Sequence, residues 1–214
     1  MTTVADRFIA NLEGGDVFAD PFRHWIMREV FPDAIARELD GIEVSAGENL
    51  DYGGRRECNN AQRVFFSPDV QARNPAAAAV AGALADPRTV AAIERVTGCD
   101  LEGSLLRVEY AQDSDGFWLE PHTDIGAKRF TLLCYLSVGE GGEGCGTDLF
   151  HPDRTLAKTP PFHFNTALVF VPGQDTWHGF APRPIPGIRK SVIVNYVTPD
   201  WRARHELASE RPVR

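Results

Sequence analysis

The chain has 214 residues, 43% hydrophobic and 10% aromatic, a composition that is typical of a globular protein and excludes a disordered one. Its formal net charge is −8, without a basic stripe, which argues against nucleic acid and anionic membranes as partners. This length suits one domain, 1–214, that buries a substantial core.

The four cysteines lie far apart and form no C-x-x-C pair, so neither a disulfide framework nor a zinc finger is expected. Cys134 sits inside an apolar run and is expected in the core. The N-terminal segment carries Asp6 and Glu13 without a long apolar stretch, so we expect no signal peptide. The small-apolar run at 76–85 is too short to span a bilayer, and a reducing cytoplasm is the expected compartment.

The first hundred residues predict short strands and helices that flank a later core. One helix has clear signals at both ends: Asp86 is suited to the N-cap and Pro87 to the first helical position, and Gly98 is suited to the position just past the C-terminus. The run at 75–85 is rich in alanine and begins with proline, which favours a packing helix. In chain order we expect a strand in 21–31, a helix over 32–39, a strand at 63–66, and helices over 75–85 and 86–97.

After Leu101 the pattern changes to β-rich runs separated by turn clusters. The turn cluster "GEGGEGCGTD" holds five glycines between Gly139 and Gly146. Several strands at short spacing with glycine-rich turns predict a mainly β fold, a jelly-roll barrel or double-stranded β-helix over 101–200, with the helices of 1–100 outside it. The expected strands are 104–111, 129–138, 165–172 and 189–197, and "DWRARHELASE" at 200–210 favours a short C-terminal helix.

The stretch "EPHTDIGAKRF" at 120–130 contains the first chemical signal. Side chains two apart on a strand share a face, so His122 and Asp124 point the same way. An imidazole beside a carboxylate supplies two of the ligands that a divalent metal needs, although this short pattern also arises by chance. His178, in "VPGQDTWHGF" after a strand and a Pro-Gly turn, is a candidate third ligand, because a jelly roll brings distant strands together.

The last β-run, "RKSVIVNYV", predicts an anion site. Alternation places Arg189, Ser191, Ile193 and Asn195 on one face. A buried guanidinium needs an anion, and its fork suits bidentate pairing with a carboxylate to which a serine hydroxyl also donates. The alternative is an internal ion pair, for which Glu109 is the obvious partner.

Five segments in order resemble the iron(II)- and 2-oxoglutarate-dependent oxygenases, in their prolyl-4-hydroxylase-like branch. They are "RVEYAQDSDGFWLEPHTD", "RFTLLCYLS", "GGEGCGTDLF", "NTALVFVPGQDTWHGF" and "IRKSVIVNYV", which together cover roughly residues 104–197. The resemblance implies a facial triad of His122, Asp124 and His178 on Fe(II). It also implies that Arg189 and Ser191 bind the distal carboxylate of 2-oxoglutarate.

The resemblance further implies hydroxylation of a substrate with O2, accompanied by release of succinate and CO2. Tyr110 precedes the His-x-Asp motif by one strand and is expected either to add its hydroxyl to the co-substrate pocket or to be a core tyrosine. Halogenating relatives lack the carboxylate of the triad, so Asp124 implies hydroxylation or a related oxidation. Nucleic-acid-dealkylating relatives place a second arginine where this chain has Asn195, which argues against a repair enzyme.

The expected substrate is a small molecule or an amino-acid-like compound. The segment "GRRECNNAQRVFF" at 54–66 is locally basic and rich in amides, so Arg63 and Asn60 are candidate substrate residues, unless this is an ordinary solvated loop. Trp118 and Phe117, just before the metal motif, are candidates for the pocket wall, with core packing as the alternative. The rival functions are a non-oxidative metal-binding cupin, such as an isomerase or a sugar-binding protein, and a metal-free jelly-roll interaction module.

Overall fold

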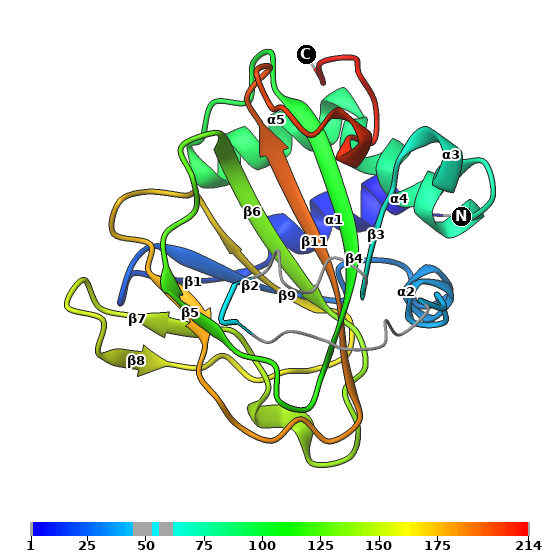
Figure 1. Ribbon diagram of the computed structural model, residues 1–214. Helices are drawn as coiled ribbons and strands as arrows, with labels where there is room; N and C mark the ends of the chain where they lie inside the picture. The colour runs from blue at the N-terminus through cyan, green and yellow to red at the C-terminus, as the bar shows by residue number, and fades with distance from the viewer. Residues whose placement is uncertain (1, 45–52, 56–61, 214) are drawn as a thin grey trace.

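A computed structural model describes residues 2–44, 53–55 and 62–213 of the chain. The described residues form two antiparallel sheets that face each other, with helices packed on the outer side of the larger sheet (Figure 1). The larger sheet has seven strands in the order β1-β2-β9-β6-β11-β4-β3, and the smaller has four in the order β5-β10-β7-β8. Most neighbouring strands are not consecutive in the chain, as in β2-β9, β6-β11, β11-β4 and β5-β10, which the expected double-stranded β-helix requires.

The strands of the larger sheet are β1 (Asp16–Phe18), β2 (His24–Arg28), β3 (Arg63–Phe65), β4 (Leu105–Ser114), β6 (Lys128–Tyr135), β9 (Thr166–Phe170) and β11 (Ile188–Val197). Those of the smaller sheet are β5 (Leu119–His122), β7 (Asp148–Phe150), β8 (Leu156–Lys158) and β10 (His178–Phe180). The long strands β4, β6, β9 and β11 fall inside or close to the runs that the sequence predicts as β. The glycine cluster becomes the turn between β6 and β7, where it includes the short 3₁₀ turn Gly142–Gly144.

The helices are α1 (Val4–Glu13), α2 (Asp33–Asp40), α3 (Pro68–Gln71), α4 (Pro75–Ala85) and α5 (Pro87–Thr97). The predicted boundary between α4 and α5 is confirmed, because the Asp86 side chain accepts a hydrogen bond from the backbone of Arg88 at 2.8 Å. Gly98 ends α5 in the left-handed conformation, with φ of 80°. No single described helix is long and apolar enough to cross a membrane; α4 and α5 together reach that length and composition, but they are bent by 60°.

Apolar side chains pack in two main clusters, one on each face of the larger sheet. The cluster between this sheet and the helices includes Phe8, Leu84, Val108, Val194 and the predicted core residue Cys134. The cluster between the two sheets is smaller and includes Phe117, Leu133, Phe180 and Ile193. The sheet therefore has a mainly apolar outer face and an inner face that leaves room for polar groups.

One prediction at the C-terminus is wrong. The segment 200–210 forms only the 3₁₀ turn Arg204–Glu206 instead of a helix. Leu207 makes an isolated bridge to Arg107 of β4, so the segment follows the sheet and the turn lies at the end of the barrel. Packing against the sheet has overridden the helix propensity of these residues.

Candidate active site

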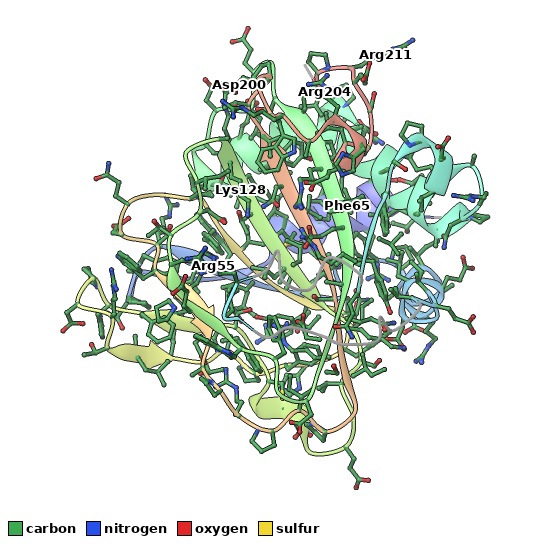
Figure 2. All side chains as sticks on the ribbon, in the orientation of Figure 1. Arg55, Phe65, Lys128, Asp200, Arg204 and Arg211 are labelled. Carbon is green, nitrogen blue, oxygen red and sulfur yellow. The ribbon has the colours of Figure 1, made fainter. Side chains whose placement is uncertain are left out.

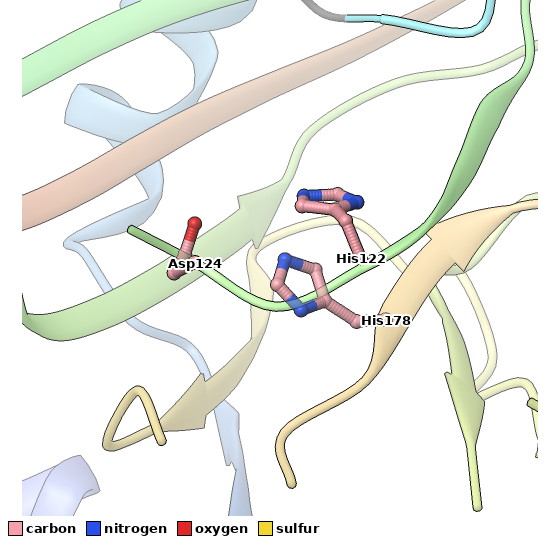
Figure 3. A group of neighbouring side chains, drawn as sticks. All are labelled: His122, Asp124 and His178. Carbon is pink, nitrogen blue, oxygen red and sulfur yellow. The ribbon is translucent and has the colours of Figure 1, made fainter. Parts of the chain in front are cut away.

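Two short strands of the smaller sheet bring the predicted metal ligands together. β10 pairs with β5 in a register that places His178 opposite His122, and Asp124 follows two residues later in the loop after β5. One ligand atom of each of the three side chains lies within 4.8 Å of the others. Figure 3 shows the two imidazoles and the carboxylate converging on one region. The geometry satisfies the sequence expectation of a His-Asp-His cluster.

Backbone carbonyls fix both imidazoles in the orientation that a metal needs. The Nδ1 of His122 lies 2.8 Å from the carbonyl oxygen of Glu120, and the Nδ1 of His178 lies 2.9 Å from that of Thr176. Each Nδ1 therefore carries the proton and donates it to the carbonyl, which leaves Nε2 as the basic nitrogen. Burial lowers the pKa of His178 to about 4, ahead of the opposing effect of Asp124, so this ligand is neutral at ordinary pH.

The third ligand is held by two neighbours on β6. The Asp124 carboxylate accepts hydrogen bonds from Lys128 Nζ at 2.6 Å and from Thr131 Oγ1 at 2.7 Å. Burial alone would raise the pKa of Asp124, but the Lys128 ammonium, His178 and these hydrogen bonds hold it below its ordinary value. Asp124 is thus an ionised, oriented carboxylate. The sequence analysis missed Lys128 and Thr131, although both follow the His-x-Asp motif on the next strand.

The triad opens into a cavity of about 380 Å³ between the two sheets. In the cavity wall Arg189 lies beside Thr147, whereas Lys128 pairs with Val197 and Trp201 packs on Arg107 near the opposite end of β11. We call this second group, together with the lining residue Arg55, the mouth. Figure 2 labels Arg55 and Lys128 on the ribbon. Apolar side chains line the space between, namely Phe117, Leu119, Ile125, Leu133, Phe180 and Ile193. The cavity has the mixed apolar and polar wall of a small-molecule site.

Arg189 lies in the cavity wall, and its ion-pair partner is Asp113. Its Nη1 donates to Asp113 at 2.6 Å, and its Nε donates to the carbonyl oxygen of Cys145 at 2.7 Å. Nη2 lies 3.4 Å from Thr147 Oγ1. The alternative partner from the sequence, Glu109, pairs instead with Arg63 and Arg107. The antiparallel register explains this, because it sets Arg189 opposite Asp113 and Ile193 opposite Glu109.

Ser191 and Tyr110 lie on opposite faces of the larger sheet. Ser191 shares a face with Arg189 and Ile193, but it lies behind the cavity wall and is not one of the lining residues. Its Oγ is buried without a hydrogen-bond partner in the described part of the chain. Tyr110 packs in the cluster beneath the helices, and its hydroxyl accepts from Gln112 at 3.1 Å. The expectation that Tyr110 adds its hydroxyl to the co-substrate pocket is therefore wrong, since strand alternation turns it to the other face.

The predicted substrate residues have different positions. Arg63 lines the cavity mouth with only 7% of its side chain exposed, and it pairs with Glu109. Asn60 lies outside the described residues. Trp118 packs over Gly54, where any added Cβ would fall 2.3 Å from the indole, and it does not line the cavity. The other candidate, Phe117, does line the cavity.

Comparisons with known proteins identify the fold. No protein-family model and no curated protein sequence matches the chain. Among solved structures, the chain is similar to a prolyl hydroxylase from Trichoplax adhaerens, with a TM-score of 0.58 and 14% identity over 90% of this chain and 88% of that one. A prolyl-4-hydroxylase from Pseudomonas putida gives a TM-score of 0.57 and 15% identity over 92% and 99%.

A third similar structure is HygX from Streptomyces hygroscopicus with nickel and 2-oxoglutarate bound. Its TM-score is 0.52, with 14% identity over 82% of this chain and 81% of that one. These likenesses, with the two-sheet topology, show that the chain has the double-stranded β-helix fold of the iron- and 2-oxoglutarate-dependent oxygenases. Within that fold the similar structures include the prolyl-hydroxylase branch that the sequence resembles.

Proposed function

We propose that this protein is an iron(II)- and 2-oxoglutarate-dependent oxygenase that hydroxylates a small molecule. The observation that carries the proposal is the partly buried cluster of His122, Asp124 and His178, in which both imidazole Nδ1 atoms are already engaged by backbone carbonyls. Two imidazoles and one carboxylate on one side of a metal leave the other positions open, which is the ligand set of non-haem iron oxygenases. Zinc or manganese would also bind these ligands in a purified sample, because affinity alone does not select iron.

The far end of the cavity suits the distal carboxylate of 2-oxoglutarate. A guanidinium has five N–H donors, and Arg189 directs three at Asp113, Cys145 and Thr147, so two remain for a carboxylate. Ser191 supplies a second argument. Its buried hydroxyl has no partner among the described residues, and a buried unmet donor costs free energy that a ligand oxygen would recover. Thr147 offers a second hydroxyl beside Arg189.

The rest of the cavity serves the chemistry by position and by exclusion of water. O2 would be the oxidant, activated by the bound iron, and 2-oxoglutarate would be oxidised together with the substrate and leave as succinate and CO2. Phe117, Leu133 and Phe180 line the space between Arg189 and the triad and keep water from it. Lys128 and Thr131 hold Asp124 in one orientation. The presence of Asp124 favours hydroxylation, because this carboxylate takes the position that halogenating relatives leave for chloride.

The test is aerobic incubation of the protein with Fe(II), ascorbate and 2-oxoglutarate, with succinate measured over time. We expect slow succinate formation even without a substrate, its loss under anaerobic conditions, and its loss in Asp124→Ala. Metal bound by the wild type without any consumption of 2-oxoglutarate would favour the rival non-oxidative cupin. That rival accounts for the metal ligands but leaves Arg189 and the partnerless Ser191 hydroxyl without a role.

The cytoplasm stays the predicted location. Cys99, Cys134 and Cys145 are free thiols, which agrees with a reducing compartment. Fractionation of cells that express the full chain from its own promoter would test this. Recovery of the protein in a membrane pellet or outside the cell would contradict it.

A further inference from the structure

Charged side chains line the mouth of the cavity, beyond the metal ligands as seen from Arg189. β4 and β11 run antiparallel, with Arg107 opposite Asn195. Asn195 and Arg189 are six residues apart on β11, so Arg107, Asn195 and Arg189 all belong to the inner face of the sheet. At about 3.3 Å per residue, Asn195 and Arg189 are separated by roughly 20 Å. Thr131 of β6 pairs with Asn195 and donates to Asp124, which places the metal ligands near this end of the sheet.

Arg107 is the centre of the mouth and is held on every side. Its three nitrogens donate to Glu206, Asn195 and Glu109. Its guanidinium also lies 4.9 Å from the ring centroid of Phe65 and 5.4 Å from that of Trp201. Only 5% of the side chain is exposed. Arg107 is therefore a rigid part of the wall, with its charge balanced by two carboxylates.

The other cations of the mouth are paired as well. Arg63 pairs with Glu109, whose side chain is 2% exposed. Lys128 pairs with Asp124 at 2.6 Å, and the exposed Arg55 lies 3.7 Å from Glu120. Among the described residues the mouth thus has four positive groups (Arg55, Arg63, Arg107 and Lys128) and four negative groups (Glu109, Glu120, Asp124 and Glu206). A metal dication and a 2-oxoglutarate dianion would add charges that cancel.

Arginines in a cavity wall usually suggest an anionic substrate. At this mouth they do not, because each is already paired with a carboxylate. Arg107 already pairs with two carboxylates, whereas Arg189 pairs with one, and Arg63 shares Glu109 with Arg107. An anion at Arg63 or Arg107 would either be repelled by Glu109 and Glu206 or displace one of them, which leaves a carboxylate buried and unpaired. The only described cation at the mouth with most of its side chain in solvent is Arg55, at 73% exposure, and salt screens such a group.

We propose that the mouth binds an uncharged substrate rich in hydroxyl groups, such as a polyol or a sugar-like molecule. The proposal rests on the oxygenase function and names the substrate class of the same site. A hydroxyl both donates and accepts, so it can bond to a wall in which guanidinium, carboxylate and amide groups alternate without breaking any pair. Arg107, Asn195, Thr131 and Asp124 are joined by consecutive hydrogen bonds, so the wall that orients the substrate is fixed relative to a metal ligand.

The test uses matched pairs of probes that differ in one carboxylate: methyl glucoside with methyl glucuronide, and erythritol with erythronate. The protein is loaded with Mn(II) and 2-oxoglutarate, and binding near the metal is measured by the paramagnetic relaxation of the probe protons. We expect the uncharged member of at least one pair to bind about tenfold or more tightly than its charged partner. If no uncharged probe exceeds its charged partner, the proposal is overturned.

Two variants make the test specific to the wall. Glu206→Gln keeps a similar shape but gives the mouth a net positive charge, so the preference within each pair should move toward the charged probe by about tenfold. Glu13→Gln changes the net charge equally on α1, where Glu13 pairs with Arg95, and should leave the preference unchanged. Equal shifts in both variants would overturn the proposal.

The relaxation experiment needs no turnover, and this separates the two hypotheses. Absence of succinate formation with Fe(II) counts against the oxygenase function, whatever the probes do. Succinate formation combined with tighter binding of the charged probes would leave the function intact and overturn the substrate class.

Discussion

The two faces of the larger sheet have opposite chemistry, although the same strands build both. On β4 and β11 the residues that face the helices are apolar or aromatic: Leu106, Val108, Tyr110, Val192, Val194 and Tyr196. The alternate residues of the same strands face the smaller sheet and are mostly charged or polar: Arg107, Glu109, Asp113, Arg189, Ser191 and Asn195. All of these side chains are buried, so burial alone does not distinguish the face that holds the fold together from the face that carries the site.

The difference between the faces is how their buried groups are satisfied. The outer face gains stability from apolar area, about 25 cal/mol per Å² removed from water. The inner face gains little from its ions, because burying a pair costs desolvation that the pairing only repays. A chain that keeps several buried ion pairs on one face uses them to fix positions around the cavity. Substitutions on the inner face should therefore change binding, and those on the outer face should change stability.

The largest effect is expected from the metal ligands. His178→Ala removes one of three ligands and should weaken binding of Fe(II) or Mn(II) more than a hundredfold, because removal of orienting partners alone typically costs 10–100-fold. The thermal midpoint of the metal-free protein should change by only a few degrees, since His178 contributes no apolar packing to the helical side. Calorimetric titration with Mn(II) measures the binding. Retention of wild-type affinity would show that another residue completes the site.

Adjacent leucines on β6 test the contrast directly. Leu132 is fully buried beneath the helices, whereas Leu133 lines the cavity. Leu132→Ala should lower the free energy of unfolding by roughly 2–5 kcal/mol, the usual cost of a core leucine. Leu133→Ala should cost clearly less, because part of its surroundings is already open space, and should weaken ligand binding instead. Urea denaturation of both variants measures this, and equal losses would remove the distinction between the faces.

Arg189→Ala should raise the apparent KM for 2-oxoglutarate by roughly 30-fold or more, which corresponds to the loss of about 2 kcal/mol at ~1.4 kcal/mol per tenfold. The variant also removes the ion-pair partner of Asp113, a side chain with 0% exposure, so some loss of stability is expected. The double variant Arg189→Met with Asp113→Asn avoids that effect and should show the same rise in KM. Mn(II) affinity should be unchanged in both; an unchanged KM would remove Arg189 from the co-substrate site.

The sequence was sufficient where a local period decides the outcome. Alternation along β11 placed Arg189 with Ser191, and the Asp86-Pro87 pair marked a helix start that the structure confirms. His122 and Asp124 do lie together, but Asp124 is in the loop after β5, so the strand argument is not the reason. The sequence was insufficient where the register between strands decides. Asp113 rather than Glu109 opposes Arg189 because of the pairing of β4 with β11, and no local pattern reveals that pairing.

Other residues were missed for different physical reasons. Thr147 reaches the cavity through the fold of a glycine-rich turn, whose path depends on tertiary contacts. Tyr110 was assigned from its distance along the chain, although alternation from Glu109 already turns it to the outer face. The pairing of Arg63 with a buried glutamate on another strand is also a tertiary property. Because Arg63 is paired with Glu109, the basic segment at 54–66 is no longer an argument for an anionic substrate.

The smallest expected effect is a contrast between two hydroxyls on neighbouring strands. Ser191→Ala removes a buried hydroxyl that has no partner among the described residues, so it should leave stability unchanged or raise it slightly. It should nevertheless raise the KM for 2-oxoglutarate about tenfold, by loss of one hydrogen bond to a charged group at roughly 1.5 kcal/mol. Tyr110→Phe removes a hydroxyl that bonds to Gln112 on the outer face, so it should cost some stability and leave KM unchanged. Steady-state kinetics and thermal unfolding measure KM and stability for both variants. Ser191→Ala should change KM without loss of stability, and Tyr110→Phe should change only stability. If Tyr110→Phe raised KM as much as Ser191→Ala, the outer face would contribute to co-substrate binding, and the division of labour between the two faces of the sheet would be wrong.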